Sequence, residues 1–143
     1  MKDLRAFFAQ NLKPADSVTY VATERLIDPE TGKPPEWEIT PVSANENLEI
    51  RRNCIRMVPI PGKKNQYSQN IDVNAYTIKL AVRCTRFPNL NDAELQDSYG
   101  VKSAEQLLGA MLDPGELDDY AQKVLEVNGF EKTESDLVEE AKN

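Results

Sequence analysis

The chain of 143 residues contains no histidine and two cysteines. Histidine is the side chain that most often serves as a general acid or base near neutral pH, so its absence removes the commonest catalytic group. With no histidine and no closely spaced cysteine pair, a structural zinc site is not expected. We expect Cys54 and Cys84 to be buried thiols that fill space, with a disulfide or half of a metal site as the alternative.

The sequence also lacks the short motifs that bind nucleotides or carry a catalytic serine: it has no G-x-x-x-x-G-K-[ST], no G-x-G-x-x-G and no G-x-S-x-G. Neighbouring carboxylates occur, as at Asp118 and Asp119, but adjacent side chains on a helix point in different directions. A solvated acidic face explains such pairs. We therefore expect a protein that is not an enzyme and that holds neither a cofactor nor a metal ion.

Long apolar runs are absent as well. Charged residues interrupt the first positions, at Lys2, Asp3 and Arg5, so we expect neither a signal peptide nor a membrane anchor, and hence a cytoplasmic protein. The net charge is -7 and uneven: residues 1–70 have 10 basic and 9 acidic residues, residues 71–143 have 7 and 15. The acidic second half repels phosphate backbones, which argues against nucleic acid as a partner.

What is present predicts one α+β domain over residues 1–130, mostly helical, with one N-terminal β-hairpin at about 17–42 on a helical core. Val18 and Tyr20 lie on one face of an alternating segment, and Trp37 and Ile39 share a face of the returning strand. A lone hairpin is marginal in water, so its apolar face should lie on helices. Trp37 is the expected anchor there; an exposed aromatic used for binding is the alternative.

Apolar spacings of three and four predict helices over residues 3–11, 43–58, 72–87, 103–112 and 113–127. The 72–87 helix is the most apolar and should be buried at the centre. Residues 63–70 should be a polar loop. Residues 131–143 form an acidic tail, for which a frayed helix and disorder both remain open.

Two apolar features and one basic pair are candidates for binding. Phe7 and Phe8 in the first helix should dock on the core, with a partner contact as the alternative. Arg52 and Arg56 would share a helix face, either as an anion clamp or, more simply, as a solvated pair. The stripe along the last helix is the candidate partner surface, although a plain helical core produces the same pattern; its members are Leu117, Tyr120, Val124 and Leu125.

Several segments together resemble a known family. They run in the family's order along nearly the whole chain, and the long central one is the most specific. These segments are Phe7 to Asn11, Asp28 to Lys33 with Trp37-Glu38-Ile39, Arg51 to Cys54, Val58-Pro59, Phe87 to Val101, Met111 to Glu116, and Val127 to Phe130. In this combination the chain resembles the XkdN-like tail assembly chaperones of phages and defective prophages of Gram-positive bacteria.

The resemblance implies a role in assembly rather than a reaction. Such proteins are thought to coat the tape measure protein, a long helical chain, before the tail tube polymerises around it, and then to leave. It implies the tape measure protein as partner, with the tail tube protein and a second copy of this chain as further candidates, and absence from the mature virion. A structural component of the tail or baseplate is the alternative.

Overall fold

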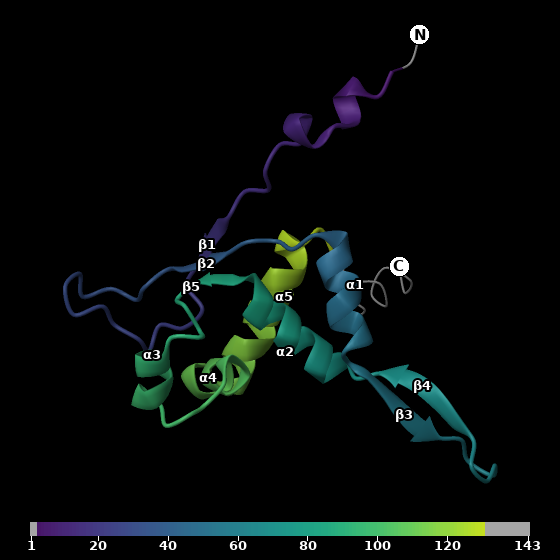
Figure 1. Cartoon of the computed structure of the whole chain (residues 1–143). Helices are drawn as coiled ribbons and strands as arrows, with labels where there is room; N and C mark the ends of the chain where they lie inside the picture. Colours follow the sequence, from purple (N-terminus) through teal and green to yellow (C-terminus); the bar gives the residue numbers. More distant parts are fainter. Residues whose placement is uncertain (1–2, 131–143) are drawn as a thin grey trace, which may run out of the picture.

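The computed structural model describes residues 3–130 and has five α-helices and two small antiparallel sheets in that range (Figure 1). The mixed α+β class is confirmed. The predicted tail at 131–143 lies outside the described residues. In chain order the elements are the 3₁₀ turns η1 (Arg5–Phe7) and η2 (Ala9–Asn11), β1 (Val18–Tyr20), β2 (Trp37–Ile39), α1 (Ala44–Arg52), β3 (Ile55–Pro59), β4 (Tyr67–Ile71), α2 (Val73–Cys84), β5 (Thr85–Phe87), α3 (Ala93–Ser98), α4 (Ala104–Met111) and α5 (Pro114–Val127).

Helix α2 lies at the centre, as predicted, and contacts α1, α4 and α5 (Figure 1). It begins at Asp72, whose carboxylate accepts a hydrogen bond from the Ala75 amide at 3.1 Å and so satisfies an otherwise unpaired backbone donor. Leu80 and Cys84 are buried on its inner face. The predicted stripe does not extend to both ends, because Val73 is 67% exposed.

The first sheet has the strand order β1-β2-β5. β1 and β2 pair antiparallel, with Val18 opposite Ile39, and Trp37 is 1% exposed, so its predicted place in the core is confirmed. The third strand was missed: residues 85–87 were assigned to the end of the central helix. They leave the helix because Thr85 pairs with Ile39 across the sheet, and Pro88 disfavours helix in the residue before it.

The second sheet corrects two further assignments. The helix predicted over 43–58 ends at Arg52, and Ile55–Pro59 is strand β3, which pairs with β4 at 67–71 in the region predicted as a loop. Cys54 is buried in the turn between α1 and β3 rather than on a helix. The helical interpretation failed because this segment fits both periodicities: Ile55 and Val58 have a helical spacing, and Ile55 and Met57 have the spacing of one strand face. A partner strand eight residues beyond β3 decided between them. Arg52 and Arg56 are both exposed but lie on different elements.

The β3–β4 hairpin extends from the domain on the side of Figure 1 away from α3 and the 24–36 loop. Its base is closed by the Asp72 amide, which donates to the Cys54 carbonyl at 2.7 Å. Along the strands one face is apolar, since strand residues two apart point the same way. We call this the arm, and its apolar face is formed by Ile55, Met57, Pro59, Tyr67 and Ile71.

The N-terminal segment also departs from expectation. It forms two short 3₁₀ turns rather than a helix, and it extends away from the domain (Figure 1). Phe7 is 83% exposed and Phe8 48% exposed, so the prediction that they dock on the core is wrong. A segment this short cannot bury both rings by itself, and in this structure the rings face solvent.

The last two helices agree with prediction. Ser103 caps α4, and Asp113 caps α5 in a reciprocal arrangement in which each of Asp113 and Glu116 accepts a hydrogen bond from the other's backbone amide. Pro114 occupies the first helical position, where its missing N–H costs nothing. The chain leaves α5 through Gly129, whose φ of +90° suits glycine.

Candidate functional site

An apolar groove of about 280 Å³ is the best candidate for a binding site in the described part of the chain. It lies between the 26–36 loop and the segment from β5 to α3, with β2 and α4 behind it. Most of its lining side chains are apolar, and three of them are prolines. The lining residues are Leu26, Ile27, Asp28, Pro29, Pro35, Glu36, Trp37, Phe87, Pro88, Leu95, Tyr99 and Met111.

One wall is the 26–36 loop, which internal hydrogen bonds hold in shape. The Asp28 amide donates to the Lys33 carbonyl at 2.9 Å, and the Gly32 amide donates to the Asp28 carbonyl at 2.8 Å. Gly32 has a φ of +72°, which a side chain would disfavour. Arg25 ties the loop to the helices, since its guanidinium bonds the Met111 carbonyl at 3.3 Å and Glu116 at 3.0 Å.

The opposite wall runs from β5 into α3. Asp92 caps α3 by accepting from the Leu95 amide at 2.8 Å. The Gln96 side chain donates to the carbonyl of the buried residue Leu90 at 2.8 Å, which fixes α3 against the chain that precedes it. Leu95 in α3 and Tyr99, the residue that ends this helix, consequently both face the groove, four positions apart.

The floor of the groove is part of the core. Trp37 is buried there, and its ring meets that of Tyr120 edge-on with centroids 5.1 Å apart, a favourable aromatic arrangement. At the mouth, Ile27 is 54% exposed and Phe87 is 56% exposed. Apolar side chains thus continue from the core to the surface, and an apolar side chain of another molecule would bury them.

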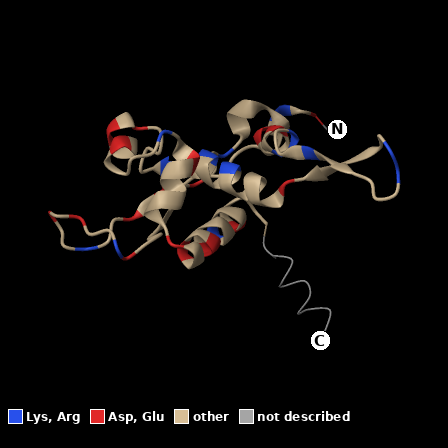
Figure 2. Ribbon diagram, turned by 90° about the horizontal axis from the view of Figure 1, so that it is seen from below, with Lys and Arg blue, Asp and Glu red and all other residues tan. Residues whose placement is uncertain are grey.

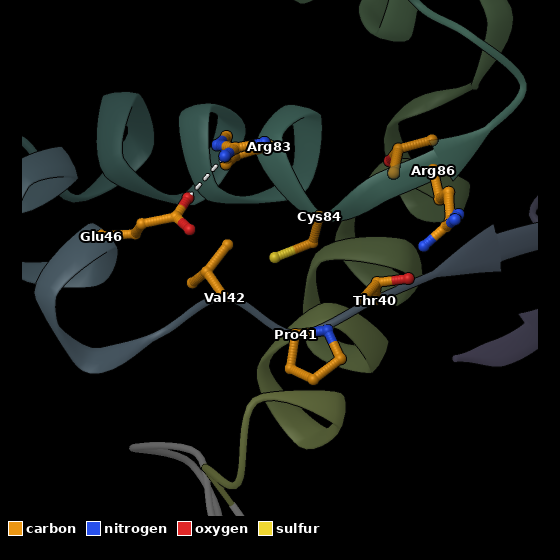
Figure 3. A pocket seen from close by; sticks show the side chains of 8 residues that line it. Thr40, Pro41, Val42, Glu46, Arg83, Cys84 and Arg86 are labelled. Atoms are coloured by element: carbon orange, nitrogen blue, oxygen red, sulfur yellow. Dashed lines mark ion pairs between the residues drawn. The ribbon is translucent and has the colours of Figure 1, made fainter. Parts of the chain in front are cut away.

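A second hollow, of about 300 Å³, has a polar mouth (Figure 3). Arg83 reaches Glu46 across it at 2.7 Å, and the Cys84 side chain points toward Val42. The only other arginine that lines this hollow, Arg86, lies 3.9 Å from Glu38. Because both cations have carboxylate neighbours, an added anion would meet local negative charge, and this hollow is a poor anion site.

The described residues offer little for catalysis. Burial raises the pKa of the Cys54 and Cys84 thiols, which keeps both protonated and weakly nucleophilic. Among residues 3–130 no group of three or more acidic or cysteine side chains is arranged to hold a metal ion. In the same range no helix has the length and apolar character needed to cross a membrane.

The structure separates the four side chains predicted to bind a partner. Tyr120 and Val124 are buried in the core, with exposed fractions of 0% and 1%. Leu117 and Leu125 are half-buried, and Leu117 borders a shallow hollow of about 170 Å³ between α2 and α5. Partner binding through this stripe stays a prediction. In the conformation described here the two buried members can contact a partner only if α5 moves.

Sequence reasoning did not identify the groove, although signals for it exist. Its walls carry Pro29, Pro35 and Pro88, which confine the chain outside helices, and its mouth uses Ile27, which fits no buried stripe. Phe87, also at the mouth, was instead assigned to the buried stripe of the central helix, and it is 56% exposed. These residues come from segments about 60 positions apart. Only the pairing of β5 with β2 brings them together, and that pairing was not predicted.

Comparison with known proteins agrees with the resemblance noted from the sequence. The family model described as phage XkdN-like tail assembly chaperone protein matches residues 4–142. The phage-like element PBSX protein XkdN of Bacillus subtilis (strain 168) is 22% identical over 142 residues, covering 99% of this chain and 94% of that protein. The uncharacterized protein YqbN of the same strain is 25% identical over 143 residues, covering 99% and 93%.

A crystal structure of the protein YqbN has a similar fold, with a TM-score of 0.73 and 20% sequence identity over 91% of this chain and 98% of that one. At this identity the likeness supports the architecture alone. The family model, in contrast, spans nearly the whole sequence, including both walls of the groove. This chain belongs to the XkdN-like phage tail assembly chaperone family.

Proposed function

We propose that this chaperone binds the tape measure protein transiently during tail assembly, holding apolar side chains of that protein in the groove at Trp37 and Phe87. Family membership supplies the role in tail assembly, and the apolar groove is the observation that supports the mode of binding. A non-catalytic role accords with that family. Binding would take place in the cytoplasm of the bacterial host.

The groove suits anchor side chains of a helix better than a whole polypeptide element. Its volume of about 280 Å³ lies at the small end of the roughly 300–1,000 Å³ typical of ligand pockets. An amphipathic helix presents apolar residues three or four apart, so one or two of them can enter while the helix lies across the mouth. Such a contact covers exposed apolar surface that would otherwise favour aggregation.

A small, shallow contact at the groove also suits a chaperone that must dissociate from the tape measure protein. Interfaces that bury little surface are weak and transient, and many weak copies along one long chain bind it collectively. A polymerising tail tube could then displace the copies one after another. This is the physical reason to prefer a chaperone to a permanent component.

The mouth of the groove offers a direct test. Ile27→Ser and Phe87→Ser should each weaken binding of the tape measure protein from the same phage genome at least about tenfold, measured by isothermal titration calorimetry. Both residues are more than half exposed, so unfolding free energy should change by less than about 1 kcal/mol. Leu48→Ser on α1, where Leu48 is 50% exposed, removes similar apolar surface away from the groove and should bind normally.

Wild-type affinity in both groove variants would refute this binding mode. Mass spectrometry of purified phage tails then separates the two roles. We expect this chain to be absent from them. Recovery at a fixed stoichiometry with the tube protein would instead identify a structural component of the tail or baseplate.

A further inference from the structure

The arm differs in charge from the rest of the molecule. Residues 55–71 contain three basic residues and no acidic one, whereas the remainder of the chain has 14 basic and 24 acidic residues, a net charge of -10. Lys63 and Lys64 lie in the connection at the tip of the arm, which is blue in Figure 2, beyond strands β3 and β4. A segment of +3 on so acidic a protein indicates a partner of negative charge.

The arm also presents apolar side chains that the other described residues leave about half exposed. Met57 is 57% exposed, Tyr67 54%, Ile71 45% and Ile55 42%, and all four lie on the same face of the hairpin. A two-stranded hairpin in water gains little stability from such a face by itself. A binding surface is the usual meaning of apolar residues gathered in this way and rimmed by charge.

The groove has the complementary character. Its lining is apolar, and the two segments that border it, residues 28–36 and 92–98, hold six acidic residues and one basic one, a net charge of -5. The charge of the arm, +3, is opposite in sign. The groove accepts one or two large side chains, and Met57 and Tyr67 are the most exposed apolar side chains of the arm.

The arm cannot fill the groove of its own molecule. In Figure 1 and in the perpendicular view of Figure 2, the arm extends on one side of the domain, while α3 and the 28–36 loop lie on the other. The base of the arm is fixed by the Cys54–Asp72 hydrogen bond and by the pairing of Ile55 with Ile71. A second copy of the chain is the nearest source of a complementary surface.

We propose that the arm of one copy docks in the groove of the next, so that the free protein associates head to tail. The two surfaces differ, so the contact is heterologous and extends beyond a dimer unless the rotation closes a ring. Docking covers the groove with the weakly bound arm of a neighbouring copy. The tape measure protein would then have to displace this arm, which rests on the proposed function; the self-association itself does not rest on it.

Sedimentation velocity from about 5 to 500 μM in 50 mM salt tests the proposal on the full chain alone. We expect the average mass to rise with concentration past the dimer, and the association to weaken at least fivefold in 500 mM salt, because exposed charges are screened there. Met57→Glu should abolish the association. Ser68→Glu makes the same charge change on the opposite face of the arm and should leave most of it intact.

A mixing experiment tests the polarity of the contact. Met57→Glu has an intact groove, and Phe87→Glu has an intact arm, so each should be monomeric alone while an equimolar mixture forms a species no larger than a dimer. If Phe87→Glu still dimerises alone, arm pairs with arm and the proposal is wrong. A wild-type chain that stays monomeric at every concentration, or an arm that instead binds duplex DNA with micromolar affinity, would also overturn it. Circular dichroism should show both variants folded, since both sites are exposed.

None of these measurements includes the tape measure protein. Loss of the association therefore leaves the proposed chaperone role standing, and loss of tape measure binding leaves the association standing. If both hold, unlabelled tape measure fragment should convert the oligomer to monomeric complexes.

Discussion

Tyr120 connects the sheet with the helices at the level of a single side chain. Its hydroxyl lies 2.6 Å from the Thr85 hydroxyl, and Thr85 donates to the Ala81 carbonyl at 2.7 Å. Because a threonine hydroxyl has one proton, Tyr120 is the donor in the pair. Its ring lies edge-on to Trp37 and 6.0 Å from Tyr20. Tyr120 of α5 therefore contacts a residue in each of the three strands of the first sheet, and Thr85 links it to α2.

Stability at alkaline pH should report this burial. Desolvation raises the pKa of Tyr120 to about 12, against about 10 in an unfolded chain. Below pH 10 the phenol is neutral in both states and stability is unaffected; from pH 10 to 12 the unfolded state loses its proton first, so stability falls. Urea unfolding at pH 9 to 12 measures this effect. The free energy of unfolding of Tyr120→Phe should fall by about 2 kcal/mol less than that of wild type over this range.

At pH 7 the free energy of unfolding of Tyr120→Phe should be about 1 kcal/mol lower than that of wild type, which is the usual contribution of one hydrogen bond. Tyr99→Phe is the matched control, because Tyr99 is half-buried and its hydroxyl has no partner among the hydrogen bonds of the described residues. Parallel pH curves for wild type and Tyr120→Phe would contradict the assignment.

Among individual residues, the sequence predicted burial better than exposure. Trp37 and Cys84 were placed in the core correctly, because an alternating strand and a helical stripe each have one evident inner face. Phe7 was assigned to the core wrongly, since hydrophobicity alone does not say whether a ring has anything to pack against. Tyr120 was correctly placed on the apolar stripe of its helix, but a stripe does not reveal whether it is open or covered.

At the scale of elements, helix starts were predictable, and so was the pairing of β1 with β2, whereas strands β3, β4 and β5 were not. Capping residues act on their own neighbours, so Ser43, Asp72, Ser103 and Asp113 predict four helix starts from local sequence alone. Strand β3 depends on β4 and β5 depends on β2, which are non-local pairings. The groove inherits this difficulty, since its walls meet only after β5 pairs with β2.

The reciprocal cap of α5 should be measurable. Asp113→Ala removes the acceptor for the Glu116 amide, at 2.8 Å, and should lower the free energy of unfolding by about 1 kcal/mol. Asp118→Ala deletes an exposed carboxylate from the body of the same helix and should cost less than about half of that. Chemical denaturation of the two variants beside wild type provides the comparison; equal losses would mean that the cap is not the cause.

At the scale of the whole molecule, the compact part begins at β1. The only hydrogen bonds of residues 3–16 found in the structure stay within that segment, and none of these residues is buried. Ser17 is the first to reach across, with its hydroxyl 2.7 Å from that of Thr40. The N-terminal rings are thus free to serve a contact without any cost to the fold.

Deleting residues 1–16 should therefore leave the melting temperature within about 2 °C of wild type, as measured by differential scanning calorimetry. Deleting residues 1–20 also removes β1, including Tyr20 with its contact to Tyr120, and should lower it by roughly 4 °C or more. A large loss from the shorter deletion would show that the segment docks on the core after all.

The closed base of the arm has one more consequence. The Cys54–Asp72 hydrogen bond and the Ile55–Ile71 pair bring the entry and exit of the hairpin together. The length of the hairpin can therefore change without moving the elements on either side of it. Each strand of five residues spans about 17 Å. Removing or adding two residues on each strand would shorten or extend this reach by about 7 Å and would keep the same side chains on each face. Helices α1 and α2 would stay in place. The hairpin thus acts as an adjustable spacer, a dimension that mutation can tune without rebuilding the domain that carries it.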